Sequence, residues 1–255
     1  MFKSPDVVCD IGEGFGIWEF GSDAALMKHI TMANIACGGH AGDPVIMSRT
    51  IDMAAAAGVK IGAHPGFPDM MSFGRKAMLL DADEIGALLV YQIGALQGFL
   101  RAKELTLNHV FPHGAMYAYL SSDDSIALAA ARAIHAVAPG VDVPWPAPTE
   151  GAVYAEELAQ LGHHIVPMAL VDMKYNADGS IMLERGRKRA TDIEYTRAQT
   201  HSICTRSEIV RNDGTATHIA GIEALLFHSD GPNAVAVAET ITETLRQARA
   251  ELPMS

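Results

Sequence analysis

Short segments rich in glycine and proline surround four of the 11 histidines of this sequence: His40, His64, His113 and His228. Glycine lets a ligand approach the backbone closely, and proline fixes the direction of a turn. An imidazole held there can act as a base, orient a substrate or bind a metal ion, so we expect these four to carry function. The other histidines are expected to be surface or structural residues: His29, His109, His135, His163, His164, His201 and His218.

Two carboxylates accompany these histidines near the N-terminus. Asp10 and Glu13 are three residues apart in the segment CDIGEGFG, residues 9–16, whose glycines let the chain curl so that both carboxylates face one side. Such a pair can act as base and orienter, or can bind a divalent metal together with neighbouring imidazoles. A turn with a capping aspartate is the alternative interpretation. The glycine spacing could also expose backbone N–H groups to a phosphate, although it matches neither the dinucleotide-binding fingerprint nor the P-loop.

The elements that must position these side chains alternate between short apolar strands and longer helices. Strands are predicted over residues 6–9, 31–36, 59–63, 107–111, 141–145, 164–168 and 223–228. Helices are predicted over residues 43–57, 81–103, 123–138, 149–161 and 231–250, with Asp43 and Asp81 as caps. This alternation predicts an α/β protein whose parallel sheet closes into a β/α barrel.

The polar residues stand at the C-terminal ends of the predicted strands. In chain order they are Asp10, Glu13, Asn34, His40, His64, His113, Asp172, His228 and Asp230. In a parallel barrel these ends form one rim, where active sites are built from loops that follow several different strands. We therefore expect these side chains to meet in one site.

Residues 171–217 depart from the alternation of strand and helix. They show little periodicity and hold eight of the 19 basic residues, including four in the run 185–189. A long irregular segment of this kind is usually a functional lid or a loop that carries small elements of its own. A solvated charged loop and closure over an anionic ligand both fit its composition. We expect residues 1–255 to form a single barrel domain with this excursion.

The composition excludes several other classes of protein. Hydrophobic residues make up 49% and charged residues 19%, as in folded soluble proteins. The net charge of −11 disfavours nucleic acids and anionic membranes as partners. The apolar stretches 53–59 and 126–131 are too short to span a bilayer and no secretory signal is visible, so we expect a cytoplasmic protein. Three cysteines are too few for a disulfide scaffold and are expected to be reduced.

The chemistry that these residues favour is hydrolysis by an activated water. The sequence has no Gly-x-Ser-x-Gly segment, and Cys37, near His40, lies in a strand-end run expected to be buried. Carboxylates and imidazoles on one rim are typical of a water nucleophile that is activated by a base or a metal. The pattern indicates cleavage of an amide, an ester or a related bond.

Four segments, in order over about 110 residues, resemble the LamB/YcsF family. They are residues 9–16 (CDIGEGFG), 33–44 (ANIACGGHAGDP), 62–75 (GAHPGFPD followed by FGR) and 112–117 (PHGAMY). The resemblance implies a seven-stranded β/α barrel similar to the polysaccharide-deacetylase-like barrels. It also implies opening of the lactam 5-oxoproline to glutamate, with ATP as cofactor and in complex with two partner subunits.

The resemblance also assigns site residues by their positions in these motifs. Asp10, Glu13 and His113, together with Asp172, are the expected catalytic residues. The expected substrate-binding residues are Asn34, His40, His64, Arg75, Tyr175, His228 and Asp230.

Three positions depart from the family pattern. Phe111 stands where the family has lysine, Met168 where it has glutamate and Met173 where it has arginine. The loss of these charges indicates a divergent member whose pocket suits a larger or less charged substrate. The basic run 185–189 could supply replacement charge.

Two alternatives to lactam hydrolysis remain open. One is metal-dependent deacylation without ATP, in which Asp10, His40 and His64 bind a divalent cation. The other is a barrel that has lost catalysis and serves as a scaffold for partner proteins. The charge losses favour the scaffold, whereas the retained carboxylates and histidines oppose it.

Overall fold

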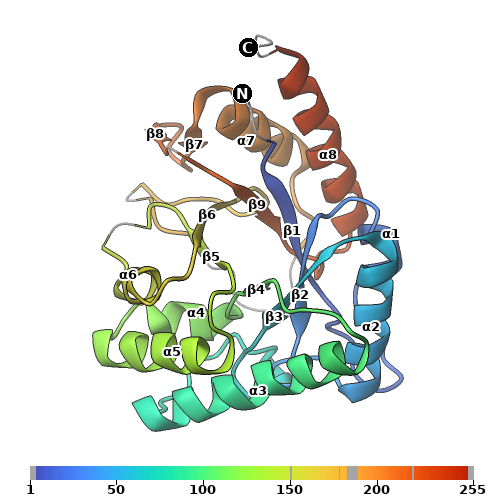
Figure 1. Cartoon of the computed structure of the whole chain (residues 1–255). Coiled ribbons are helices and arrows are strands. Elements are labelled where there is room, and N and C mark those ends of the chain that lie inside the picture. Colours follow the sequence, from blue (N-terminus) through green and yellow to red (C-terminus); the bar gives the residue numbers. More distant parts are fainter. Residues whose placement is uncertain (1–3, 150, 178, 183–188, 220, 252–255) are drawn as a thin grey trace.

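Seven parallel strands form a nearly closed barrel in the computed structural model, which describes residues 4–149, 151–177, 179–182, 189–219 and 221–251 (Figure 1). The strands are β1 (Asp6–Ile11), β2 (Met32–Ala36), β3 (Lys60–His64), β4 (His109–Val110), β5 (Val143–Pro146), β6 (Ile165–Leu170) and β9 (Ala224–Phe227). Their order in the sheet is β4-β3-β2-β1-β9-β6-β5. The predicted seven-stranded β/α barrel is confirmed.

Backbone hydrogen bonds bring the two ends of this sheet together. The N–H of Val110 donates to the carbonyl of Asp142 at 3.1 Å, and the N–H of Asp142 donates to the carbonyl of Asn108 at 2.9 Å. β4 therefore lies beside the residue that precedes β5. Strands such as β2 are buried along their whole length, because helices cover the barrel outside and side chains fill it inside.

Helices cover the outside of the barrel, and capping residues set their bounds (Figure 1). α2 (Pro44–Ala57) follows Asp43, whose side chain accepts two backbone N–H groups, and it ends at Gly58, where φ is 69°. α3 (Ala82–Ala102) begins with a reciprocal capping box between Asp81 and Glu84. The remaining predicted helices are α5 (Asp124–Val137), α6 (Val153–Gln160) and α8 (Ala234–Glu251).

The segment 171–217 holds regular elements that the sequence analysis did not predict. These are α7 (Ile193–Arg206) and an antiparallel pair, β7 (Glu208–Val210) and β8 (Ala216–His218). α7 packs against α8, yet four of its five buried residues are polar: Thr196, Gln199, Thr200 and Ser202. A helix whose buried side is polar shows no hydrophobic periodicity, which explains why the prediction failed. In the basic run 185–189, residues 185–188 lie outside the described residues.

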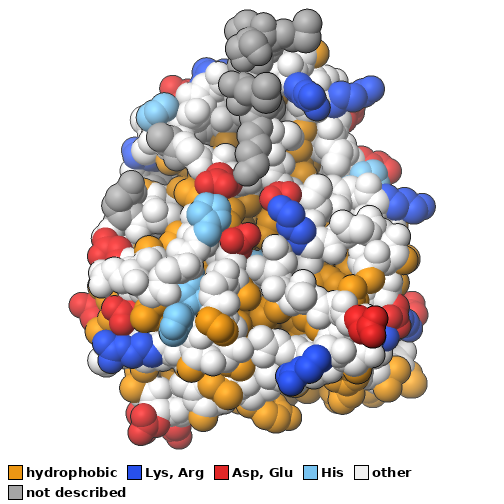
Figure 2. All heavy atoms as spheres, in the orientation of Figure 1, with side chains coloured by type: hydrophobic (Ala, Val, Ile, Leu, Met, Phe, Trp, Pro, Cys, Tyr) orange, Lys and Arg blue, Asp and Glu red, His pale blue; other side chains and the backbone are white. Residues whose placement is uncertain are grey.

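By length and composition alone, α3 could cross a membrane. In the structure it packs against α5, and an apolar stripe of it is buried: Ile85, Leu89, Ile93, Leu96 and Leu100. Such a stripe is typical of a helix that covers the core of a globular protein. Hydrophobic side chains also gather along the lower edge of the face in Figure 2, where Figure 1 labels α3.

Three short elements, also unpredicted, occupy loops that follow the strands. They are α1 (Asp23–Leu26), the 3-10 turn η1 (Met70–Ser72) and α4 (Gly114–Leu120). Asp23 at the start of α1 accepts the N–H of Gly12 through Oδ2 at 3.1 Å. Its other oxygen is buried and has no hydrogen-bond partner among the described residues. Burial raises the pKa of Asp23 to about 6.

Replacing Asp23 with Asn is expected to stabilise the protein at pH 7. The amide oxygen can still accept the Gly12 N–H, and no buried charge remains. Because the pKa of Asp23 is raised on folding, its ionisation costs stability above about pH 6, and this cost vanishes as the pH falls below about 4. We expect a gain of about 1–3 kcal/mol at pH 7, measured by urea unfolding, and a much smaller gain at pH 4.5. A destabilised variant at pH 7 would contradict this account.

Candidate active site

A cavity of about 600 Å³ lies at the C-terminal ends of the barrel strands. Six of the predicted site residues line it: Asp10, His64, Arg75, His113, Asp172 and His228. They belong to β1 and β3 or to the loops that follow β3, β4, β6 and β9. The structure thus brings side chains from distant parts of the sequence to one rim, as a parallel barrel requires.

A row of hydrogen bonds across four neighbouring strands fixes Asp10. In the register of the sheet, Asp10 lies beside Asn34, Asn34 beside Gly62, and Gly62 beside His109. Asn34 Nδ2 donates to Asp10 Oδ1 at 2.8 Å, so Asn34 Oδ1 is left to accept from His109 Nε2, also at 2.8 Å. The imidazole of His109 occupies the space that a side chain at Gly62 would need. His109, expected to be structural, is therefore a positioning residue for Asp10.

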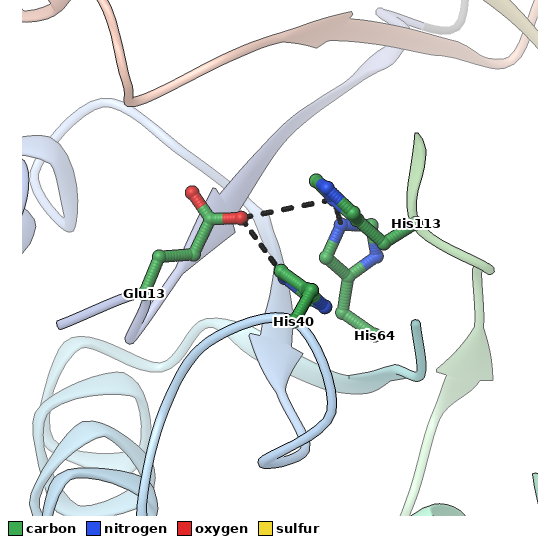
Figure 3. Close-up of side chains that lie close together, drawn as sticks. All are labelled: Glu13, His40, His64 and His113. Atoms are coloured by element: carbon green, nitrogen blue, oxygen red, sulfur yellow. Dashed lines mark hydrogen bonds and ion pairs between the residues drawn. The ribbon is translucent and has the colours of Figure 1, made fainter. Parts of the chain in front are cut away.

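His64 and His113 face each other beside this row (Figure 3). His64 Nδ1 donates to the carbonyl of Phe111 at 2.6 Å, and His113 Nε2 donates to the carbonyl of Phe73 at 2.9 Å. A carbonyl oxygen only accepts, so these two nitrogens carry the protons. The other two nitrogens, His64 Nε2 and His113 Nδ1, lie 2.9 Å apart. When both rings are neutral, each of these nitrogens presents a lone pair to the other.

Glu13 and His40 complete a buried group with these two histidines (Figure 3). Glu13 Oε1 lies 3.2 Å from His40 Nε2 and 3.8 Å from His113 Nδ1. Ser229 donates to Glu13 Oε2 at 3.2 Å. One ligand-capable atom from each of the four residues lies within 4.8 Å of all the others. Carboxylate and imidazole are common ligands of divalent metals, so this group could bind one.

Burial and neighbouring charges move the pKa values of the two carboxyl groups in opposite directions. Burial opposes the ionisation of Asp10, but the nearby imidazoles, above all His64, outweigh it and hold the pKa of Asp10 well below its ordinary range. Burial, followed by the negative charge of Asp10, raises the pKa of Glu13 well above its ordinary value. Burial also lowers the pKa of His113, and His40 adds to the effect. Carboxyl pairs with separated pKa values are typical of acid–base sites.

Two further pairs of charged groups shape the cavity wall. Asp172 accepts the backbone N–H of His228 at 3.1 Å and lies 3.2 Å from its Nδ1. Arg75 Nη2 donates to Asp230 Oδ2 at 2.6 Å, and the Arg75 side chain keeps 23% of its surface exposed. The Arg75 guanidinium also lies over the ring of Phe73, 5.1 Å from its centre. Arg75 is thus held in place while part of it still faces the cavity.

Five predicted site residues do not line the cavity: Glu13, Asn34, His40, Tyr175 and Asp230. Four of them bind residues that do line it or that stand beside those residues, as described above. Tyr175 differs, because its buried hydroxyl accepts the backbone N–H of Leu170 at 2.8 Å. The structure thus places Tyr175 in the support of β6 and not against a substrate, contrary to the expectation from the sequence.

An apolar wall, which the sequence analysis did not identify as a whole, faces the same cavity. It includes Phe111, Tyr117, Leu170, Met173 and Tyr195. Phe111 and Met173 are two of the departures from the family pattern, whereas Met168, the third, is fully buried in the core. Tyr195 belongs to the unpredicted α7, so its position could not be anticipated. Two cations, Lys174 and Arg189, also line the cavity.

The cysteines do not supply a nucleophile to this site. Burial raises the pKa of Cys37 to about 12 and also raises that of Cys9 well above its ordinary value. Thiols in such surroundings stay protonated and unreactive.

Known proteins resemble this chain over nearly its whole length, and a model of the LamB/YcsF family matches residues 5–254. A 5-oxoprolinase subunit of Methylococcus capsulatus is 41% identical over 243 residues, which cover 94% of this chain and 92% of that protein. The corresponding 5-oxoprolinase subunit of Bacillus subtilis is 37% identical over 248 residues, covering 97% and 95%. The crystal structure of the lactam utilization protein from Thermus thermophilus superimposes with a TM-score of 0.86 at 34% identity, covering 97% and 98%. The chain therefore belongs to the LamB/YcsF family.

Proposed function

We propose that this chain hydrolyses a cyclic amide and that its substrate is 5-oxoproline or a related lactam. The observation that carries the proposal is the convergence of Asp10, His64 and His113 on one cavity wall. The names of the relatives, two subunits of 5-oxoprolinase and one lactam utilization protein, support the choice of a lactam as the bond that is cut.

The geometry supports a water-mediated ring opening. Water adds to the lactam carbonyl carbon, the carbon–nitrogen bond breaks, and the ring nitrogen gains a proton, so that one water is consumed. Asp10 is the proposed base because it lines the cavity, Asn34 holds it at 2.8 Å, and His64 Nε2 lies 3.4 Å away. His113 stands next to His64 on the same wall and can return a proton to the leaving nitrogen.

Arg75 is the proposed anchor for a carboxylate on the substrate. Its guanidinium is oriented by Asp230 and lines the cavity. Guanidinium groups bind carboxylates through paired hydrogen bonds, which fix the orientation as well as the position of the bound acid. A lactam that carries a carboxylate, as 5-oxoproline does, would be held with its ring directed by this contact.

We include ATP and partner subunits in the proposal. Two relatives are each named as one subunit of 5-oxoprolinase, which supports an assembly with further subunits. The cavity, at about 600 Å³, is of the size that holds drug-sized ligands, and Lys174 and Arg189 in its wall can bind phosphate oxygens. The reaction would take place in the cytoplasm, where ATP is available.

The Asp10→Asn variant is expected to lose turnover without losing its fold. Asn34 can still donate to the new amide oxygen, but the base is absent, so we expect kcat to fall at least about 100-fold. Asp52→Asn, on the exposed side of α2, is the matched control because it removes a carboxylate that pairs only with Lys103 among the described residues. Turnover of Asp10→Asn close to that of the control would contradict the assigned role.

The Arg75→Lys variant separates carboxylate recognition from catalysis. Lysine keeps the charge beside Asp230 but loses the paired hydrogen bonds, so we expect KM for 5-oxoproline to rise about tenfold. Hydrolysis of 2-pyrrolidinone, the same ring without a carboxylate, should change little. An equal effect on both substrates would show that Arg75 does not bind the carboxylate.

The proposal as a whole is tested with the chain purified by affinity from its native cells, together with the subunits that accompany it, and with the chain alone. Each preparation receives 5-oxoproline or a panel of lactams, with and without ATP, and the ring-opened amino acid is measured by mass spectrometry. We expect glutamate from 5-oxoproline, dependent on ATP and on the accompanying subunits. Absence of ring-opened product from every lactam would overturn the proposal, and release of amines from acylated substrates would favour the deacylase alternative.

A further inference from the structure

We propose that His64, His113 and Glu13 bind one divalent metal ion at the wall of the cavity. The inference goes beyond the proposed function, because the ion would bind whichever bond the enzyme breaks. The argument starts from the hydrogen-bonding capacity of the two histidines.

Both imidazoles spend their N–H groups on backbone carbonyls. His64 Nδ1 binds the carbonyl of Phe111 at 2.6 Å, and His113 Nε2 binds that of Phe73 at 2.9 Å. The nitrogens that remain are 2.9 Å apart and can both only accept when the rings are neutral. Two lone pairs at this distance repel each other unless a positive charge lies between or beside them.

The surroundings of the two nitrogens add further electron pairs. Asp10 Oδ1 lies 3.4 Å from His64 Nε2, and Glu13 Oε1 lies 3.8 Å from His113 Nδ1. A single proton between the imidazoles would satisfy only that one contact. A divalent cation would satisfy both imidazoles and a carboxylate at the same time.

The separations of these atoms suit a metal. Four ligands at 2.0–2.2 Å in a tetrahedral arrangement lie roughly 3.3–3.6 Å from one another. The separations of 2.9 Å and 3.8 Å fall on either side of that range. Small movements of the side chains would bring them to it.

His40 is not a ligand in this site, although it belongs to the same buried group. Its ring is stacked on that of His113, with the centres 3.7 Å apart and the planes at 5°. An imidazole binds a metal in the plane of its ring, so an ion in the plane of His113 lies well outside the plane of His40. His40 instead contacts Glu13 at 3.2 Å and can orient it.

The hydrogen bonds and the cavity complete a pattern typical of catalytic metal sites. Metal-binding histidines usually donate their second nitrogen to a carbonyl or carboxylate, as His64 and His113 do here. Three protein ligands leave a coordination position open, and His64 and His113 both line the cavity. An ion there would lie within reach of a water in the cavity.

The test measures metal binding directly and needs no activity. The full chain is stripped with a chelator, dialysed against Zn²⁺ or Co²⁺, and analysed for metal content and for the visible absorption of bound Co²⁺. We expect about one ion per chain, with the Co²⁺ absorption of a site with nitrogen and oxygen ligands.

Variants locate the ion. His113→Gln and Glu13→Gln are each expected to weaken Zn²⁺ binding at least about tenfold, because each removes a ligand. His163→Gln is the control, since His163 also belongs to a histidine pair, 3.2 Å from His135, but should bind the ion as the wild type does. Circular dichroism and thermal unfolding establish that each variant is folded. Where His113→Gln does not fold, Glu13→Gln and the wild-type Co²⁺ spectrum decide the question.

Two results would overturn the proposal. The first is a wild-type chain that takes up no Zn²⁺ or Co²⁺ after stripping, which would mean that a shared proton holds His64 and His113 together. The second is unchanged affinity in folded Glu13→Gln or His113→Gln, which would place the ion elsewhere. Because neither readout involves turnover, failure of this inference is distinguishable from failure of the proposed lactam hydrolysis.

Discussion

Two imidazole nitrogens that point at each other across 2.9 Å set the constraint on which the active end of this barrel depends. His64 and His113 are held in this arrangement because the second nitrogen of each ring donates to a carbonyl, of Phe111 after β4 and of Phe73 after η1. Phe73 adopts a left-handed backbone conformation, with φ of 54°. Because the site is buried, neither ring can turn toward water instead, and the loops after β3 and β4 must stay packed together.

The same requirement explains why the carboxylates of the site sit in continuous networks. Asp10 is fixed through Asn34 and His109 by the register of four adjacent strands, and Gly62 leaves the space that the row needs. Glu13 is fixed from the other side by Ser229. Polar groups that the fold has already oriented need little rearrangement when a substrate arrives, which is how a preorganised site favours reaction. The barrel therefore contributes to chemistry through its strand register as much as through its loops.

The sequence predicted the barrel and the rim because their signals are local. Alternating apolar strands and capped helices determine the fold class, and the residue after a parallel strand must lie at the rim. The role of His109 was missed because it depends on a partner 75 residues away. α7 was missed because polar residues such as Gln199 face the interior, where Gln199 bonds to the backbone of Val210. Tyr175 was placed in the site by resemblance, but its contact with Leu170 is visible only in three dimensions.

The central claim is that the protons of His64 and His113 are fixed on the nitrogens that face the backbone carbonyls. The most direct measurement is nitrogen NMR of the protein labelled in its histidine side chains, with the two residues assigned by comparison with single variants. The account predicts a proton on Nδ1 of His64 and on Nε2 of His113 at neutral pH, with neither ring averaging between tautomers. Rapid tautomer averaging in either ring, or a proton on Nδ1 of a neutral His113, would contradict it.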